Sequence, residues 1–166
     1  MSWKAQQRYI DTRSDRVKLN VLSQDAVPLP PRHRTWKSFK KEFDNKNNFE
    51  FTFCGYSFVI NTRYAFKHFS QNTYSEPREH LNATITKVIE DPIIVVHSSH
   101  EEKETIVFYK PFKNTQELVH MMLFHADRNS DGKYHFNTTY SVIDNINKVK
   151  NLLKTTEEKV IYFKYD

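Results

Sequence analysis

Apolar and polar positions change their period along the chain, and these changes predict its elements. Over residues 35–45, apolar residues recur at helical spacing with lysines between them, which predicts a short, basic, amphipathic helix. Over residues 48–60, aromatic residues alternate with polar ones on both sides of Cys54-Gly55. This period of two is typical of a strand pair or of one bent strand.

Two further helices are predicted after this region. Asn61 or Thr62 can cap the first, because a short polar side chain can accept a hydrogen bond from the helix start. The second follows Ser75, has an apolar face over residues 81–89, and ends before Pro92. Proline ends it because it lacks the amide donor that a helix needs.

The rest of the chain is predicted to form mainly an antiparallel meander. Its turns are expected at residues 98–103, 111–114 and 129–132, and its strands at residues 93–97, 105–110, 118–126 and 133–140. Apolar spacing over residues 142–153 predicts a helix, and residues 160–165 a closing strand. The fold class is therefore α+β, with N-terminal helices packed on a mainly antiparallel β-sheet.

Proline and charge divide the chain into two parts. The run Val27–Pro31 contains three prolines, and it ends a basic N-terminal arm, residues 1–31, ahead of a single α+β domain, residues 32–166. Residues 1–48 carry eleven Lys and Arg against five Asp and Glu, whereas residues 49–166 carry fourteen against fifteen. This localised positive charge favours an acidic partner, and RNA is the partner we expect.

Composition excludes several classes of function. With only Gly55 and Gly132, the chain has no glycine-rich loop for ATP or a dinucleotide, so no cofactor is expected. Cys54 is the only cysteine, and no histidine spacing matches a metal site, so no metal is expected.

Two histidines could form an acid and base pair. If the loop of the last hairpin covers residues 128–132, the strand register places His125 opposite His135; a shift of one residue would separate them.

The N-terminus predicts a cytoplasmic protein without a membrane partner. Residues 1–25 are rich in charge and contain no uninterrupted apolar stretch that could serve as a signal peptide or a membrane span. A lone cysteine also suits a reducing compartment, since it cannot form an internal disulfide bond. Cytoplasmic localisation is therefore the expectation.

Several short motifs occur in a recognisable order. These are an Ile-Asn-Thr-Arg strand end, His68 on a short helix, Phe108-Tyr-Lys110, and Phe136-Asn-Thr-Thr-Tyr140. Over about residues 56–143, this order resembles the barnase, EndoU, colicin and RelE-like group of ribonucleases, in particular its phage-associated branch. The resemblance implies a metal-independent endoribonuclease whose RNA substrate attacks its own phosphodiester through the 2′-hydroxyl. It also implies that a cognate inhibitor or antitoxin protein is a possible partner.

The resemblance assigns candidate catalytic roles. His68 would transfer a proton, Lys110 would hold the phosphate, and Thr139 and Tyr140 would orient or donate hydrogen bonds. The residues expected to bind nucleic acid are basic and lie on two predicted helices: Arg63, Lys67, Lys37, Lys40 and Lys41. The alternative is a non-catalytic accessory factor that binds nucleic acid or protein through its basic end, and a toxin acting on tRNA or ribosome-bound mRNA is a third hypothesis.

Overall fold

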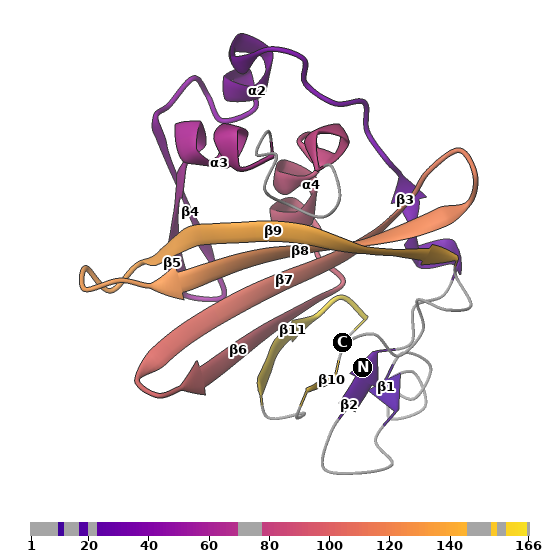
Figure 1. Ribbon diagram of the computed structural model, residues 1–166. Helices are drawn as coiled ribbons and strands as arrows, with labels where there is room; N and C mark the ends of the chain where they lie inside the picture. Colours follow the sequence, from indigo (N-terminus) through magenta and orange to yellow (C-terminus); the bar gives the residue numbers. More distant parts are fainter. Residues whose placement is uncertain are drawn as a thin grey trace.

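The computed structural model describes residues 10–11, 17–19, 23–69, 78–145, 154–155 and 159–165. In this part of the chain the fold is α+β, with a curled, mainly antiparallel sheet and α-helices gathered on one side of it (Figure 1). The helices are α2 (Trp36–Lys41), α3 (Thr62–Phe69) and α4 (Ile85–Glu90), and two 3-10 turns are η1 (Ser23–Asp25) and η2 (Glu79–Leu81).

Eight of the described strands form the main sheet. Seven follow the order β11-β6-β7-β8-β9-β5-β4, and β3 pairs with β7 outside this path. All neighbours are antiparallel except β5 with β9 and β3 with β7. The strands are β3 (Val27–Pro28), β4 (Asn48–Phe53), β5 (Tyr56–Asn61), β6 (Ile94–His100), β7 (Lys103–Lys113), β8 (Leu118–Arg128), β9 (Tyr134–Asn145) and β11 (Val160–Phe163).

A second, smaller sheet lies on the side of the main sheet away from the helices (Figure 1). It contains three short antiparallel strands in the order β1-β2-β10. Their bounds are β1 (Ile10–Asp11), β2 (Val17–Leu19) and β10 (Lys154–Thr155). This sheet joins residues near both ends of the chain.

The first predicted strand region is a hairpin rather than one bent strand. Phe53 pairs with Tyr56, so Cys54 and Gly55 form a two-residue turn, and both have positive φ, 50° and 82°. This backbone suits the right-handed twist of a hairpin, and glycine adopts it without steric cost. The alternation of Phe with polar residues along β4 then points its aromatic rings toward the core.

Aromatic side chains hold the curl of the sheet together. The ring of Phe53, at the end of the edge strand β4, lies 5.2 Å from that of Tyr162 on the opposite edge strand β11. Helix α4 contacts β7 and β8, while α3 contacts β5 and β9. The largest fully buried side chains are mostly aromatic: Phe39, Phe43, Phe58, Phe69, Phe108, Phe112, Phe124, Ile60, Leu81 and Ile85.

Several predicted boundaries are wrong. The turn predicted at residues 98–103 is only Glu101 and Glu102, because β6 continues to His100 and β7 begins at Lys103, and the second predicted helix is divided into η2 and α4. The helix predicted over residues 142–153 begins instead as strand, because β9 continues to Asn145 in register with β8; residues 146–153 lie outside the described residues. The turn predicted at residues 111–114 also begins too early, since Pro111 lies within β7 opposite Met121. Strand β6 begins at Ile94, opposite Tyr109, so it does not extend alongside Pro111, and the missing amide donor of Pro111 costs no bond to β6.

The N-terminal part of the chain is tied to the main sheet through β3. Val27 pairs in parallel with Phe112, and the amide of Leu29 donates to the carbonyl oxygen of Lys113 over 2.9 Å. The predicted division at residue 31 stays a prediction.

None of the helices in the described part of the chain has the length and apolar character that crossing a lipid bilayer requires.

Candidate nucleic-acid interface

Helix α2 buries one side and exposes lysines on the other. Thr35 starts the helix, because its hydroxyl oxygen accepts a hydrogen bond from the amide of Ser38 at 3.2 Å. Phe39 is fully buried, whereas Lys37 and Lys41 are exposed. The amphipathic pattern predicted from the sequence therefore leaves the lysine ammonium groups in water.

Helix α3 adds a second set of cations. The side-chain oxygen of Asn61 accepts from the amide of Tyr64 at 3.0 Å, which fixes the start of the helix. Ala65 and Phe69 are buried, while Arg63 and Lys67 are exposed one turn apart. The two helices contact each other, so their cations lie on neighbouring elements.

Trp36 joins the two helices through cation–π contacts. The ammonium of Lys40, on the same helix, lies 5.5 Å from the centre of the indole ring, and the guanidinium carbon of Arg63 lies 4.9 Å from it. The ring is half-buried and also packs against Phe66 of α3 at 5.6 Å. Trp36 therefore holds one cation of each helix in place.

We call the five cations of these helices the basic face: Lys37, Lys40, Lys41, Arg63 and Lys67. None of them forms an ion pair with a carboxylate of the described residues. The nearby acid Glu42 is engaged elsewhere, because it contacts the ring of His33 and accepts from Thr86. The five residues predicted to bind nucleic acid thus lie on two helices that contact each other, and Lys40 and Arg63 both lie over the ring of Trp36.

A buried amide fastens α2 to the rest of the domain. Asn82 is almost completely buried, and its side-chain oxygen accepts from the amide of His33 at 2.7 Å. Its amide nitrogen donates to the carbonyl oxygen of the same residue at 2.8 Å. These two bonds tie the segment that enters α2 to the turn between η2 and α4.

A second polar group lies at the end of α3. Nε2 of His68 is 2.9 Å from the hydroxyl of Thr138, 3.3 Å from the amide of Thr139 and 3.5 Å from a guanidinium nitrogen of Arg78. Arg78 also donates to the carbonyl oxygen of Thr139 at 3.0 Å. We call these four residues the His68 cluster.

A bulge in β9 places the two threonines. Phe136 lies opposite Ala126 and Thr138 opposite His125, so Asn137 is an extra residue in the ladder. Beyond this bulge, Thr139 donates its hydroxyl to the carbonyl oxygen of Leu123 at 2.8 Å and is 2% exposed. The bulge thus presents the backbone of Thr139 to the imidazole of His68.

His68 is 4% exposed, and its environment favours the neutral imidazole. Burial lowers the pKa of His68, the charge of Arg78 lowers it further, and the carbonyl of Thr139 acts in the opposite direction. A neutral ring with its proton on Nδ1 presents Nε2 as an acceptor. In that tautomer Nε2 accepts from the amide of Thr139 and from the guanidinium of Arg78. The carbonyl oxygen of Thr139 also lies 3.3 Å from Nε2, and it would accept from the tautomer that carries its proton on Nε2.

Lys110 lies apart from this cluster. It is 5% exposed, and its ammonium donates to the backbone oxygen and to the carboxylate of Asp91 at 2.7 and 2.9 Å. It lies opposite Met122, which lies opposite Ser141. From this register, its α-carbon is about 12 Å from that of Thr139, two strands and two residues away.

Asp91 is the partner of two lysines. Burial acts to raise the pKa of its carboxyl, but the hydrogen bonds and charges of Lys110 and Lys164 outweigh burial and hold this pKa below its usual value. Lys164 lies 3.0 Å from the same carboxylate oxygen. The carboxylate of Asp91, the residue that follows α4, thus joins Lys110 of β7 to Lys164, which follows β11.

Two residues of the His68 cluster, Arg78 and Thr138, were not among the predicted site residues. Arg78 lies ten positions after His68, so no helical or strand period links them, and only the tertiary contact identifies it. Thr138 precedes the predicted Thr139, but a regular strand would point the two side chains to opposite faces. The side chain of Tyr140 lies outside the described residues; its backbone pairs with Leu123.

The predicted pairing of His125 with His135 is wrong. The amide of Asn129 donates to the carbonyl oxygen of Lys133, so the loop begins one residue later than expected. His135 consequently lies opposite Asp127, and the bulge places Thr138 opposite His125. Asp127 accepts from Thr105 and from the side chain of Asn137, which anchors it between neighbouring strands.

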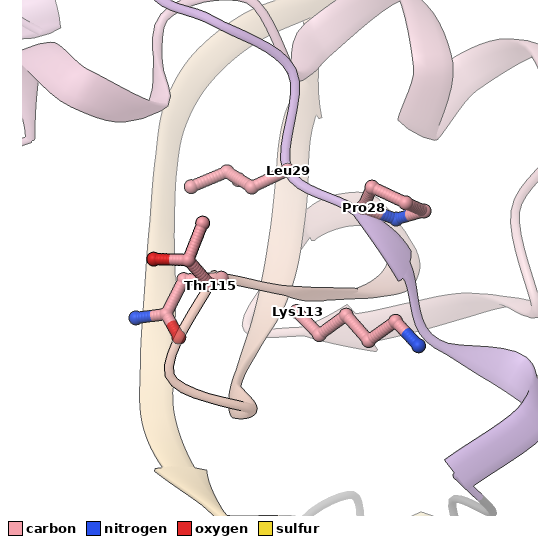
Figure 2. Close-up of a pocket in the computed structure, with 5 residues that line it drawn as sticks. Pro28, Leu29, Lys113 and Thr115 are labelled. Carbon is pink, nitrogen blue, oxygen red and sulfur yellow. The ribbon is translucent and has the colours of Figure 1, made fainter.

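A cavity of about 360 Å³ lies where β3 meets the end of β7 (Figure 2). It is lined by Pro28, Leu29, Lys113, Asn114 and Thr115. The amide group of Asn114 fixes the adjacent turn, because its oxygen accepts from the amides of Gln116 and Leu118. The cavity shares no residue with the basic face or the His68 cluster.

The described side chains contain no group of three or more histidine, cysteine or carboxylate residues that could hold a metal ion. In comparisons with known proteins, no protein-family profile, no curated protein and no solved structure matches this chain.

Proposed function

We propose that the protein binds RNA through the basic face. The observation that carries this proposal is the gathering of five cations on two neighbouring helices without carboxylate partners among the described residues. Such cations can contact phosphates and release the counterions condensed on RNA, which favours binding. In this proposal α2 and α3 belong to a helical layer packed on the sheet, and their cations face away from it.

Charge distribution supports the same surface. Residues 1–48, which include α2, have a net positive charge, whereas the rest of the chain is almost neutral. The cation–π contacts of Trp36 limit the freedom of Lys40 and Arg63 before RNA binds. Restricting them in advance lowers the entropy lost on binding.

The binding test compares two sets of substitutions that change the net charge equally. One variant replaces exposed lysines of the basic face, Lys37→Gln, Lys41→Gln and Lys67→Gln. The control replaces three lysines outside the basic face: the exposed Lys87 and Lys103 and the partly exposed Lys133, each by Gln. Of these, Lys103 pairs with Asp127 and Lys133 with Glu50. Fluorescence anisotropy with a labelled RNA should show affinity falling about tenfold or more for the first variant and little for the control. Equal losses of affinity in the two variants would show that RNA binding depends only on the net charge of the protein.

RNA cleavage by the His68 cluster is a second candidate function. The observation in its favour is that His68, Arg78 and Thr138 meet at one point. In the proposed reaction, neutral His68 accepts the proton of the 2′-hydroxyl as the 2′-oxygen bonds to phosphorus. The phosphorus–5′-oxygen bond breaks, the leaving oxygen takes a proton from water, and a 2′,3′-cyclic phosphate remains. Arg78 would stabilise the phosphorane charge.

This candidate gives Lys110 no part in the reaction, because its ammonium is engaged by Asp91. The half-buried side chains of Arg78 and Thr138 would form the approach to the buried imidazole. The test incubates the parent protein, His68→Gln, Arg78→Gln and Lys110→Met with mixed RNA in EDTA. Cyclic phosphate ends should form with the parent and Lys110→Met only. No cleavage by the parent, while binding persists, would reject this candidate and leave RNA binding standing.

A further inference from the structure

Tyr64 stands out from the other aromatic side chains. Within the described residues it is the large hydrophobic side chain with the greatest exposure, 41%. It lies on α3 between Arg63 and Lys67, two cations of the basic face, and Lys67 is its neighbour one helical turn later. The helix therefore presents a partly exposed aromatic ring between two positive charges.

The ring of Tyr64 is also held in place. Its hydroxyl donates to the backbone oxygen of Asn137, in the β9 bulge, at 2.7 Å. Its ring centre lies 5.9 Å from that of His68 at an angle of 32°, and 5.9 Å from that of Phe136, which meets it edge-on. A ring fixed at its hydroxyl and by two neighbouring rings loses little further freedom when another flat group stacks on it.

We propose that Tyr64 stacks against an unpaired base of the bound RNA, an inference that rests on the proposed RNA binding. The flat faces of bases are covered in a duplex but open in single strands and loops, where aromatic side chains stack on them. The same nucleotide's phosphates would contact Arg63 and Lys67. Phosphate contacts alone do not favour unpaired bases, so Tyr64 is the residue that would distinguish the two forms of RNA.

The position of Tyr64 also links the two proposed surfaces. Its ring lies beside His68, while Arg63, the residue before it, contacts Trp36, whose ring also lies near Lys40 of the basic face. A base stacked on Tyr64 would therefore lie between the phosphate-binding cations and the His68 cluster. This geometry favours an unpaired nucleotide as the one nearest the cluster.

The experiment measures the affinity of the full chain for two labelled RNAs of equal length, an unstructured single strand and a blunt duplex. The variants are Tyr64→Leu, which removes the ring, and Tyr64→Phe, which keeps the ring but loses the bond to Asn137. Tyr64→Leu should lose about tenfold in affinity for the single strand and little for the duplex, because stacking acts only on unpaired bases. Tyr64→Phe should bind the single strand almost as well as the parent. Circular dichroism checks that each variant is folded.

The outcomes separate this inference from the function on which it rests. If the parent binds RNA but Tyr64→Leu weakens both probes equally or neither, the stacking role is overturned and RNA binding stands. If Tyr64→Leu does not fold, Tyr64→His decides, because a smaller ring should keep part of the preference for the single strand. If the parent binds neither probe, the proposed function itself fails.

Discussion

At the scale of single residues, burial lowers the pKa of His68 and that of His125. Arg78 lowers the pKa of His68 further, and the carbonyl of Thr139 opposes it. At His125, the charge of Asp127 raises the pKa and that of Lys103 lowers it, with a net decrease. Histidines of an unfolded chain titrate near about 6.5, so the unfolded protein binds more protons than the folded protein as pH falls through this value.

We therefore expect the free energy of unfolding to be fully retained above about pH 6.5 and to fall as pH decreases below it. Urea unfolding at pH 7.5 and 5.5 measures this difference. The difference should be smaller in His68→Gln and in His125→Gln, since each variant lacks one of the shifted groups. The carboxyls with lowered pKa, those of Glu50, Asp91 and Asp131, titrate below this window. A parent protein equally stable at both pH values would contradict the expectation.

The buried contact of Lys110 with Asp91 gives a second prediction at this scale. Asp91→Ala leaves a buried ammonium with only a backbone oxygen, and we expect it to lower the free energy of unfolding by about 2 kcal/mol. This is less than for a fully buried pair, because the Asp91 side chain is 52% exposed. Lys110→Met should cost less, since Asp91 keeps Lys164. Urea unfolding tests both, and a larger loss for Lys110→Met would contradict this account.

At the scale of elements, side-chain period predicted most of the strands but not where each one ends. The alternating phenylalanines of β4 and the Cys54-Gly55 turn are local signals, and the structure confirms the strands that they predict. Strand β9 continues past the start of the predicted helix because β8 offers it partners as far as Asn145. The Asn137 bulge depends on pairing between residues that are distant in sequence, so no local sequence pattern predicts it.

The attachment of helix α2 yields a prediction about an element. Asn82→Ala removes two hydrogen bonds to the backbone of His33, so it should lower the free energy of unfolding by about 2 kcal/mol and loosen α2. RNA affinity should fall with it, because α2 carries three cations of the basic face. Asn114→Ala is the control, since it also removes two hydrogen bonds to the backbone, those from the amides of Gln116 and Leu118, far along the sequence from α2.

Urea unfolding and anisotropy, measured together, decide this prediction. Asn114→Ala should lower stability while leaving RNA affinity unchanged at a temperature where both variants are folded. If Asn82→Ala binds RNA as tightly as the parent, the position of α2 does not matter for binding. A loss of affinity in Asn114→Ala of the same size would instead trace the effect to general destabilisation.

At the scale of the whole molecule, the sequence predicted which helical cations are exposed better than it predicted which polar groups meet at His68. Charge and helical spacing identify surface lysines, because exposure follows directly from an amphipathic pattern. The contacts around His68 join residues separated by about seventy positions, and they require both the α3 helix and the bulged β9 strand. The contact of Arg78 with His68 and that of Lys110 with Asp91 both depend on the tertiary fold, so sequence spacing does not predict them.

The salt dependence of RNA binding tests the basic face as a whole. For a single strand, the logarithm of the binding constant falls with the logarithm of salt concentration by about 0.7 for each phosphate neutralised. If each of the five cations contacts one phosphate, the slope should be about −3.5 for the parent. Removing Lys37, Lys41 and Lys67 should leave about −1.4, whereas the control variant at Lys87, Lys103 and Lys133 should keep the parent slope.

Titrations at 50, 100 and 200 mM salt, concentrations of the order over which such binding weakens strongly, measure this slope. The slope counts phosphate contacts, so it does not depend on how tightly the rest of the surface holds the RNA. A stacking contact at Tyr64 is uncharged, and Tyr64→Leu should therefore weaken binding with no change in slope. If the slope of the Lys37, Lys41 and Lys67 variant equals that of the parent, the phosphates lie elsewhere on the molecule, and the basic face is not the interface.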